Sequence, residues 1–441
     1  MRVIHSLGWF LPDSTGGTET YVVGLSAELE AQGVEVRIAA ASDGPDERSY
    51  DFNSTSVYRY PVTSGRSLAQ QIGKDPHGRF ELFKNWLEQQ QANIYHQHSW
   101  TYGCGLHHLR AARELGISTV LTVHVPGPVC LRGTMLLDGC APCNGVINRR
   151  RCASCWLQAR GMPPAARQLL SSFAPSIGRR ARTLGRFGTA MAATELVERH
   201  LGSLLKAANA ADQVVAVCQW LYDALLANGV PLHKLVLNRQ GVNVVTPRLR
   251  NPSRSTGPLR LGFLGRWDPA KGIDKLVQAV IGLPSSIQLE LQIRAVEQHD
   301  PAIRAYMVDT CRAAEVDSRI RILGPLPGNA VPEFLRSIDL LVVPSQWFET
   351  GPLVVLEAFA VGTPVIGSKL GGIPELVQHG QNGWLVDYND TAAWAAAIRL
   401  LATDSALLQQ LQQGIGPVRT MRDVALETTQ LYRKLLANAA S

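Results

Sequence analysis

Residues 340–357 read LLVVPSQWFETGPLVVLE and show most clearly which fold the chain adopts. The apolar run 340–343 predicts a buried strand. Gly351-Pro352 suits the start of a helix, because proline fits the first helical position and has no N–H to leave unpaired. Glu349 then lies in the loop, and Glu357 lies on the first turns of the helix. In an open α/β sheet, such a strand-to-helix edge is where an anionic ligand is expected.

The rest of the chain alternates apolar strands with amphipathic helices in two series, the pattern of parallel sheets with crossover helices. The first series has strands at 2–7, 34–40, 93–96, 119–123 and 213–217. The second has strands at 259–264, 288–293, 319–322, 340–343, 364–366 and 384–386. A chain of 441 residues is too long for a single hydrophobic core. We therefore expect an α/β protein with two Rossmann-like domains facing across a cleft.

The domain boundaries follow from composition. Residues 247–258 are rich in Pro, Ser, Arg and Gly without periodicity and predict a linker between an N-terminal domain, 1–246, and a C-terminal domain, 259–420. We expect residues 421–441 to form a helix that packs back on the N-terminal domain. Residues 126–206 fit neither series and are interpreted as an insertion in the first domain.

Charge and cysteine content set limits on the class of protein. The net charge is +7, yet residues 132–206 alone hold twelve Lys/Arg against three Asp/Glu, so the basic character belongs to the insertion. No stretch resembles a membrane span, and the N-terminus lacks the features of a signal peptide. We therefore expect a cytoplasmic protein whose eight cysteines stay reduced.

A second strand-to-helix loop carries two cations. The strand 259–264 leads into Gly265-Arg266 and then Lys271-Gly272, before a helix that begins at Ile273. Two cations beside a helix N-terminus suit a diphosphate, although an ordinary surface loop with solvated charges is an equal alternative for this loop alone.

Glu349 and Glu357 strengthen the diphosphate interpretation. Glu357 can accept hydrogen bonds from ribose hydroxyls, and Glu349 can bind a sugar. They are alternatively plain acidic residues at a helix start, or the acid and nucleophile of a glycoside hydrolase. The hydrolase hypothesis gives no role to Arg266 or Lys271.

With these motifs in place, the chain resembles a retaining GT-B glycosyltransferase of family 4. The resemblance rests on motifs in the family's order over nearly the whole chain: Gly16-Gly17-Thr18-Glu19, Gly241-Val242-Asn243, Gly265-Arg266, Lys271-Gly272, the Glu349–Glu357 pair and Gly371-Gly372-Ile373-Pro374-Glu375. It implies transfer of a sugar from a UDP or GDP sugar to a glycan or lipid-linked acceptor in polysaccharide or glycoconjugate synthesis. It also implies attack from the face of the leaving group, with no protein nucleophile and no catalytic metal.

The resemblance assigns roles to individual residues. The residues with catalytic roles are Glu349, His124, Arg266 and Lys271. The donor-binding residues are Gly16, Gly17, Arg266, Lys271, Glu349, Gly351, Pro352, Leu353, Val354 and Glu357. His124 follows the strand 119–123, where a lone histidine is otherwise a structural residue.

Five cysteines fall within residues 130–155. The pairs Cys140-x2-Cys143 and Cys152-x2-Cys155 have the spacing of a zinc knuckle, which four thiolates complete; an iron–sulfur cluster would use the same ligands. Spacing alone favours Cys140 over Cys130. A similar segment in a subset of family 4 enzymes favours Cys130, Cys143, Cys152 and Cys155, with Cys140 as the alternate, and we expect structural zinc there.

The remaining expectations concern partners. Leu169, Leu170, Phe173 and Ile177 form one apolar helical face, a second face follows at 184–191, and arginines lie between them at 179, 180, 182 and 186. Such a basic hairpin can rest on an anionic membrane, or simply pack on the first domain. Two further alternatives are a zinc-containing nucleic-acid-binding protein, disfavoured because its arginines lack interleaved aromatics, and a GT-B fold epimerase or phosphorylase.

Overall fold

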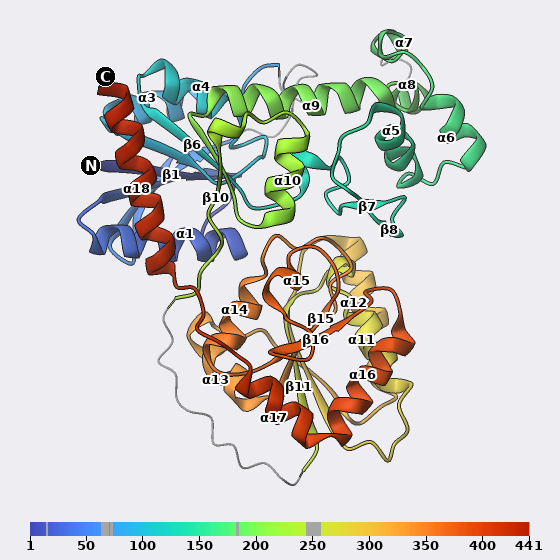
Figure 1. The fold of residues 1–441 in the computed structure, drawn as a ribbon. Helices are drawn as coiled ribbons and strands as arrows, with labels where there is room; N and C mark the ends of the chain where they lie inside the picture. Colours follow the sequence, from blue (N-terminus) through green and yellow to red (C-terminus); the bar gives the residue numbers. More distant parts are fainter. Residues whose placement is uncertain (15, 63–69, 71–73, 182–184, 244–256, 441) are drawn as a thin grey trace. The chain divides into compact units, whose positions relative to one another are not determined.

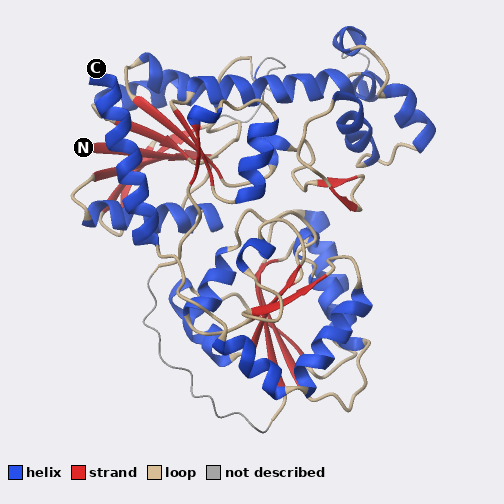
Figure 2. Ribbon diagram, viewed as in Figure 1, coloured by secondary structure: helices blue, strands red, loops and turns tan. Residues whose placement is uncertain are grey.

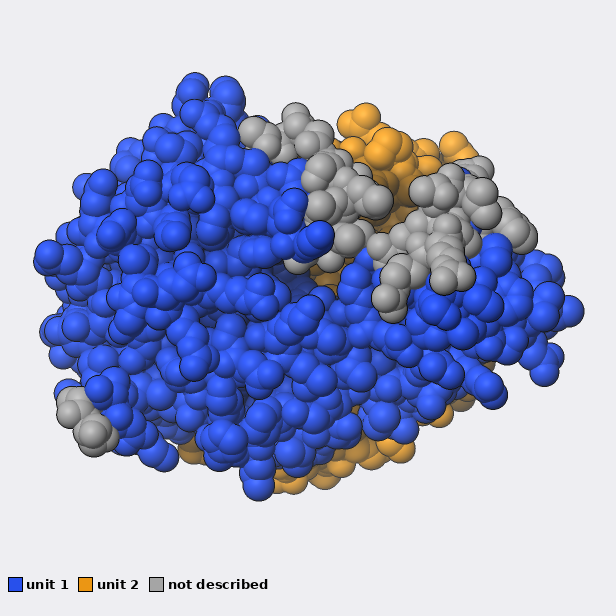
Figure 3. All heavy atoms as spheres, turned by 90° about the horizontal axis from the view of Figure 1, so that it is seen from above, with its two compact units in different colours: residues 1–240, 421–441 blue, residues 241–420 orange. Residues whose placement is uncertain are grey.

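The computed structural model describes residues 1–14, 16–62, 70, 74–181, 185–243 and 257–440. The chain forms two compact units, coloured separately in Figure 3: unit 1 comprises Met1–Gln240 and Met421–Ser441, and unit 2 comprises Gly241–Thr420. The predicted linker 247–258 lies, except for its last two residues, outside the described residues.

Unit 1 contains an eight-stranded sheet in the order β10-β9-β6-β5-β1-β2-β4-β3. All neighbouring strands pair in parallel except β3 with β4, which are antiparallel. The strands are β1 (Arg2–Leu7), β2 (Glu35–Ser42), β3 (Arg48–Phe52), β4 (Thr55–Pro61), β5 (Ile94–Gln97), β6 (Ser118–Val123), β9 (Gln213–Ala216) and β10 (Leu235–Leu237). The order reverses between β1 and β5, which makes their carboxyl ends a switch point.

Unit 2 contains a six-stranded, fully parallel sheet in the order β13-β12-β11-β14-β15-β16. Its strands are β11 (Leu259–Arg266), β12 (Leu289–Val296), β13 (Ile320–Leu323), β14 (Leu340–Val343), β15 (Val365–Ser368) and β16 (Gly383–Val386). This is the strand order of a dinucleotide-binding Rossmann sheet, and the chain direction reverses between β11 and β14. A ligand is therefore expected beyond the carboxyl ends of these two strands.

Helices cover both faces of each sheet (Figures 1 and 2). In unit 1 they are α1 (Gly17–Ala31), α3 (Phe80–Gln89), α4 (Leu106–Glu114), α9 (Ala193–Ala210), α10 (Gln219–Ala227) and α18 (Met421–Ala440). In unit 2, α11 (Ile273–Ile281), α12 (Pro301–Ala314), α16 (Thr391–Thr403) and α17 (Ser405–Gln413) share one core, and α13 (Val331–Ser337), α14 (Leu353–Ala360) and α15 (Ile373–Leu376) share the other.

The C-terminal helix α18 packs against α1 and the edge of the first core. Met421, Val424, Ala425, Tyr432 and Leu435 are buried with Tyr21, Val22 and Leu25 of α1. Tyr432 also makes a polar contact, because its hydroxyl lies 2.5 Å from Nδ1 of the buried His96. The last helix of the chain, which follows unit 2 in the sequence, thus completes the core of unit 1.

We expect Tyr432→Phe to lower the free energy of unfolding by about 1–3 kcal/mol, because the ring stays while the buried His96 nitrogen loses its partner. Urea denaturation followed by circular dichroism measures this. Leu426→Ala, at an exposed position on the same helix, should leave the free energy within about 0.5 kcal/mol. A Tyr432→Phe protein as stable as wild type would contradict the docking role of this contact.

The segment between β6 and β9 forms a small layer of its own. It contains the turn η1 (Gly127–Val129), the hairpin β7 (Leu136–Leu137) and β8 (Ala141–Pro142), and the helices α5 (Arg149–Gln158), α6 (Pro164–Leu170), α7 (Pro175–Ala181) and α8 (Gly185–Met191). Helices α5, α6 and α8 share a core with the first turns of α9, and α7 lies beside α8 and α9. Since α9 also packs on α4 and leads directly to β9, residues 193–206 belong to the crossover helix of the sheet as well as to the predicted insertion.

The predicted apolar face of the basic hairpin is divided in the structure. Leu170 is buried and Phe173 packs against the same core, whereas Leu169 and Ile177 are 60% and 44% exposed. The side chains at 179, 180, 182 and 186 lie outside the described residues. No helix in the described part of the chain combines the length and the apolar character needed to cross a membrane.

Candidate functional site

The loops after β11 and β14 meet at the switch point of unit 2. The backbone N–H of Gln346 donates to the carbonyl oxygen of Ala270 at 2.7 Å, which ties one loop to the other. Gly272, between the first loop and α11, has φ +68°, and a Cβ atom there would collide with the carbonyl oxygen of Pro344. The glycine is therefore required both by the left-handed backbone and by the close approach of the two loops.

Lys271 and Glu349 form a partly buried ion pair across these loops. Nζ of Lys271 lies 2.7 Å from Oε1 of Glu349, with side chains 21% and 8% exposed. The Ser345 hydroxyl donates to the same carboxylate oxygen at 2.8 Å. Burial by itself would raise the pKa of Glu349, but the charge and hydrogen bond of Lys271 and the bond from Ser345 outweigh it, and the pKa is lowered. Glu349 is therefore held as a carboxylate.

We expect Gly272→Ala to lower the melting temperature and to weaken nucleoside diphosphate binding, because the added methyl group strains the backbone and pushes the two loops apart. The cost should be about 1–3 kcal/mol of unfolding free energy. Gly282→Ala is the matched control: this glycine ends the same helix with φ −70°, and a Cβ there makes only ordinary contacts. Thermal unfolding of both variants with and without UDP decides the point; equal behaviour of the two would contradict it.

The chain around Glu349 is also fixed by the glycine pair at 371–372. The N–H of Gly372 donates to the carbonyl oxygen of Glu349 at 2.7 Å. Gly371 has φ +59°, and a Cβ there would stand 2.7 Å from the Glu349 nitrogen. Gly351 follows with φ +116°, and α14 begins at Leu353 directly after Pro352. The N–H groups of Leu353 and Val354 thus stand at the open first turn of a helix, where anions bind.

Glu357 and Arg266 carry charges that the protein itself does not neutralise. Glu357 lies on the second turn of α14, and burial raises the pKa of its carboxyl. The exposed Arg266 ends β11. Neither side chain has a hydrogen bond or ion pair with another residue in the described part of the chain. A carboxylate that loses water without gaining a partner suits the binding of ligand hydroxyls.

The other predicted residues, Gly16, Gly17 and His124, belong to unit 1. Gly16 is the N-cap of α1, and Gly17, its first residue, has open space where a Cβ would be. His124 is buried directly after β6, and burial lowers its pKa to about 3. The ring therefore stays neutral at pH 7.

His124 ends a chain of buried histidines that the sequence only partly indicated. Nε2 of His124 lies 3.1 Å from Nδ1 of His98, and Nε2 of His98 lies 2.8 Å from Nδ1 of His5. Each contact needs one N–H and one lone pair, so the tautomers of the rings are set together. Burial lowers the pKa of all three rings, which keeps them neutral at pH 7. His5 lies within β1 and His98 directly after β5, and no local sequence pattern brings the two together.

His5, His96 and His98 also have ring nitrogens within 4.8 Å of one another, the spacing of a possible metal group. Both nitrogens of His96 are already occupied, one by Tyr432 and one by the Thr122 hydroxyl at 2.6 Å. Both nitrogens of His98 contact other histidines. The arrangement therefore favours a hydrogen-bond network over a metal site.

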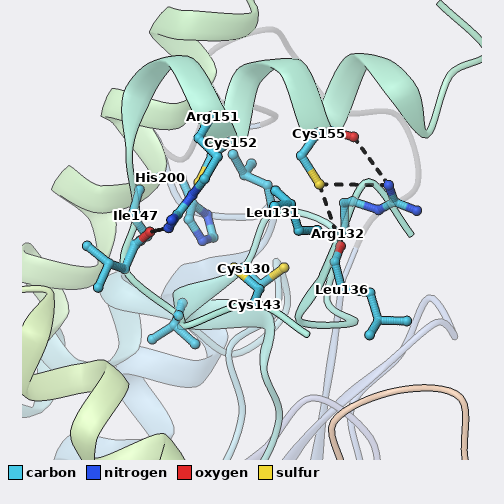
Figure 4. Close-up of a pocket in the computed structure, with 14 residues that line it drawn as sticks. Cys130, Leu131, Arg132, Leu136, Cys143, Ile147, Arg151, Cys152, Cys155 and His200 are labelled. Atoms are coloured by element: carbon cyan, nitrogen blue, oxygen red, sulfur yellow. Dashed lines mark hydrogen bonds between the residues drawn. The ribbon is translucent and has the colours of Figure 1, made fainter. Parts of the chain in front are cut away.

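The cysteines predicted to bind metal lie around one pocket of the inserted segment (Figure 4). Its lining includes Cys130, Cys143, Cys152 and Cys155, and also His200 of α9, which the sequence did not suggest. Cys140 is exposed and is not part of this lining. Metal binding itself stays a prediction.

Two family models match the chain. The one described as "Glycosyl transferase 4-like domain" matches residues 16–241, more than half of the 441 residues, and the one described as "Glycosyl transferases group 1" matches residues 246–415. The chain belongs to this glycosyltransferase family. The predicted glycosyltransferase family is therefore confirmed.

By sequence, the glycosyltransferase is similar to D-inositol 3-phosphate glycosyltransferases. It is 34% identical to that of Corynebacterium glutamicum (strain R) over 185 residues, which cover 40% of this chain and 44% of the relative. It is 26% identical to that of Arthrobacter sp. (strain FB24) over 415 residues, 89% of this chain and 83% of the relative. The match thus spans less than half the length of the corynebacterial relative.

By fold, the glycosyltransferase is similar to sucrose-phosphate synthase from Thermosynechococcus elongatus, with a TM-score of 0.69, 20% identity and 99% of both chains covered. It is also similar to Anabaena HepE, solved in complex with UDP and glucose, with a TM-score of 0.62, 14% identity, and 98% of this chain and 100% of that chain covered. These likenesses confirm the predicted α/β class and GT-B fold.

Proposed function

We propose that this glycosyltransferase moves a sugar, with retention of configuration, from a nucleoside diphosphate sugar to a glycan or lipid-linked acceptor. The observation that carries the proposal is the Lys271–Glu349 pair at the carboxyl ends of β11 and β14. It joins a partly exposed cation to a fixed carboxylate at the edge where a Rossmann sheet binds its ligand.

The charges at this edge match a diphosphate leaving group. Lys271 and Arg266 supply cations, and the first turn of α14 supplies the N–H groups of Leu353 and Val354. As the bond to the sugar breaks, negative charge grows on the diphosphate, and fixed cations stabilise it without having to rearrange. Glu357, which has no partner among the described residues, accepts from the ribose hydroxyls.

Glu349 is better suited to hold the sugar than to attack it. A carboxylate that is paired with Lys271 and accepts from Ser345 is a weak nucleophile, whereas a carboxylate fixed in this way is suited to accept hydrogen bonds from sugar hydroxyls. The departing phosphate then takes the proton of the acceptor hydroxyl, which attacks from the same face. The roles predicted for Gly16, Gly17 and His124, on the donor sugar, remain part of this proposal.

Solved HepE complexes that contain UDP, or UDP and glucose, favour a UDP sugar as the first donor to test. The names of the sequence relatives add D-inositol 3-phosphate as an acceptor to test beside glycans and lipid-linked sugars. We place the reaction in polysaccharide or glycoconjugate synthesis at the cytoplasmic face of a membrane, with peripheral contact through the basic insertion. Family membership disfavours the nucleic-acid-binding alternative.

The test is release of nucleoside diphosphate from UDP and GDP sugars with and without acceptors, followed by NMR of the product's anomeric proton. The proposal expects release that depends on the acceptor and a product with the donor's anomeric configuration. Inversion would overturn the retaining mechanism. Isomerisation of the donor without an acceptor would indicate an epimerase, and dependence on inorganic phosphate would indicate a phosphorylase.

A further inference from the structure

We propose that the inserted segment binds one zinc ion through Cys130, Cys143, Cys152 and His200. This ligand set replaces Cys155 of the predicted four-cysteine site with a histidine from the crossover helix α9. The proposal concerns unit 1 alone and does not depend on the proposed transfer reaction.

The four residues come from separate elements that meet at one pocket (Figure 4). Cys130 ends the turn η1, Cys143 follows β8, Cys152 lies on α5, and His200 lies on α9. The pocket has a volume of about 30 Å³, which suits one water-sized occupant.

His200 has the arrangement of a metal ligand. Helix α9 lies against η1, which brings the ring next to the backbone of Gly127 and Pro128, while its Nε2 is buried without a hydrogen-bond partner among the described residues. A zinc-bound histidine commonly gives its second nitrogen to a backbone carbonyl, which fixes the ring and its tautomer. A buried ring nitrogen that lacks a partner has a cost, and a metal ion in the pocket would remove it.

Cys155 is occupied in a different way. Its sulfur accepts from the N–H of Asp138 at 3.2 Å, lies 3.6 Å from the carbonyl oxygen of Leu136 and 3.8 Å from Arg132. In Figure 4 it points toward Arg132 and away from His200. Cys152 also accepts a backbone N–H, from Asn148 at 3.3 Å. What sets Cys155 apart is that its sulfur contacts the carbonyl oxygen of Leu136 and Arg132, on the side away from His200 (Figure 4).

The chemistry of the set fits zinc. Three thiolates and one imidazole form a common tetrahedral structural site. Such a site carries a net charge of −1, and Arg132 and Arg151 line the same pocket with compensating charge. No three of these ligand atoms lie within 4.8 Å of one another among the described residues, so binding requires side chains to turn inward. An ion there would join η1, the β7–β8 hairpin and α5 to the crossover helix.

The experiment measures metal by plasma mass spectrometry in full-length protein expressed with added zinc, dialysed, and isolated as a monodisperse folded fraction. We expect about one zinc per chain in wild type. His200→Ala and Cys143→Ser should lose it, whereas Cys155→Ser and Cys140→Ser should keep it. His200→Cys should restore zinc, since a thiolate can take the histidine's place.

The absorption spectrum of the cobalt-substituted protein reports how many thiolates bind the metal, without removal of a ligand. Wild-type protein should show a thiolate-to-cobalt absorption band that becomes stronger in His200→Cys, which adds a fourth thiolate. Wild type without metal, wild type with iron in place of zinc, or full zinc in His200→Ala would each overturn the proposal. So would loss of zinc in Cys155→Ser with retention in Cys152→Ser.

Discussion

Lys271→Ala should lower kcat for sugar transfer by about 10²–10³-fold, the usual cost of removing one fixed group that stabilises charge in a transition state. The side chain lies where the diphosphate is proposed to leave, and its charge also keeps Glu349 in position. Steady-state kinetics with the best donor and acceptor measures the effect.

The chain offers a matched control for this variant. Arg260 and Asp339 of unit 2 form an ion pair of 2.8 Å with exposures of 22% and 10%, close to the 21% and 8% of Lys271 and Glu349. Arg260→Ala should cost similar stability, because each substitution leaves a largely buried carboxylate without its cation. Only Lys271→Ala should lose transfer. Equal losses of kcat in both variants would show that Lys271 acts through stability alone.

Glu357→Gln should weaken binding of the nucleoside diphosphate about 10- to 100-fold, the worth of a hydrogen bond to a charged group. It should not destabilise the fold at pH 7. Calorimetric titration with UDP or GDP measures the first effect and urea denaturation the second. Glu333→Gln, an exposed glutamate on the neighbouring helix α13, should change neither.

The pH dependence of stability gives a second readout for Glu357. Burial raises the pKa of its carboxyl from the usual 4.5, so the folded state favours the protonated form. Its unfavourable contribution is absent below pH 4.5 and grows as the pH rises from there toward the folded-state pKa. The advantage of Glu357→Gln over wild type should therefore increase with pH. A variant less stable than wild type at pH 7 would mean that Glu357 has a stabilising partner.

Much of unit 2 could be predicted because its signals are local. The run 340–357 predicted β14, the loop and α14 closely, since an apolar strand and a Gly-Pro helix start are separated by few residues. Lys271 and Glu349 lie 78 positions apart, yet each sits directly after a recognisable strand. Parallel strands then bring both to the same edge.

Other features depend on tertiary contacts that no local pattern reveals. Strand β4 was not predicted, and one reason is that an arginine such as Arg59 suggests an exposed segment. In the structure its guanidinium is buried and donates to the carbonyl oxygens of Ala41 and Phe10. His200 was missed because it lies far beyond the cysteines along the chain. Only the return of α9 across the inserted segment brings it to their pocket.

We propose that the β11–β14 edge binds a nucleoside diphosphate through Lys271. Calorimetric titration of wild type and Lys271→Ala with UDP and GDP tests it most directly. We expect at least one of the two nucleotides to bind wild type at one site per chain, and to bind the variant about tenfold more weakly or worse. No binding of either nucleotide to wild type, or equal affinity in the variant, would contradict the claim.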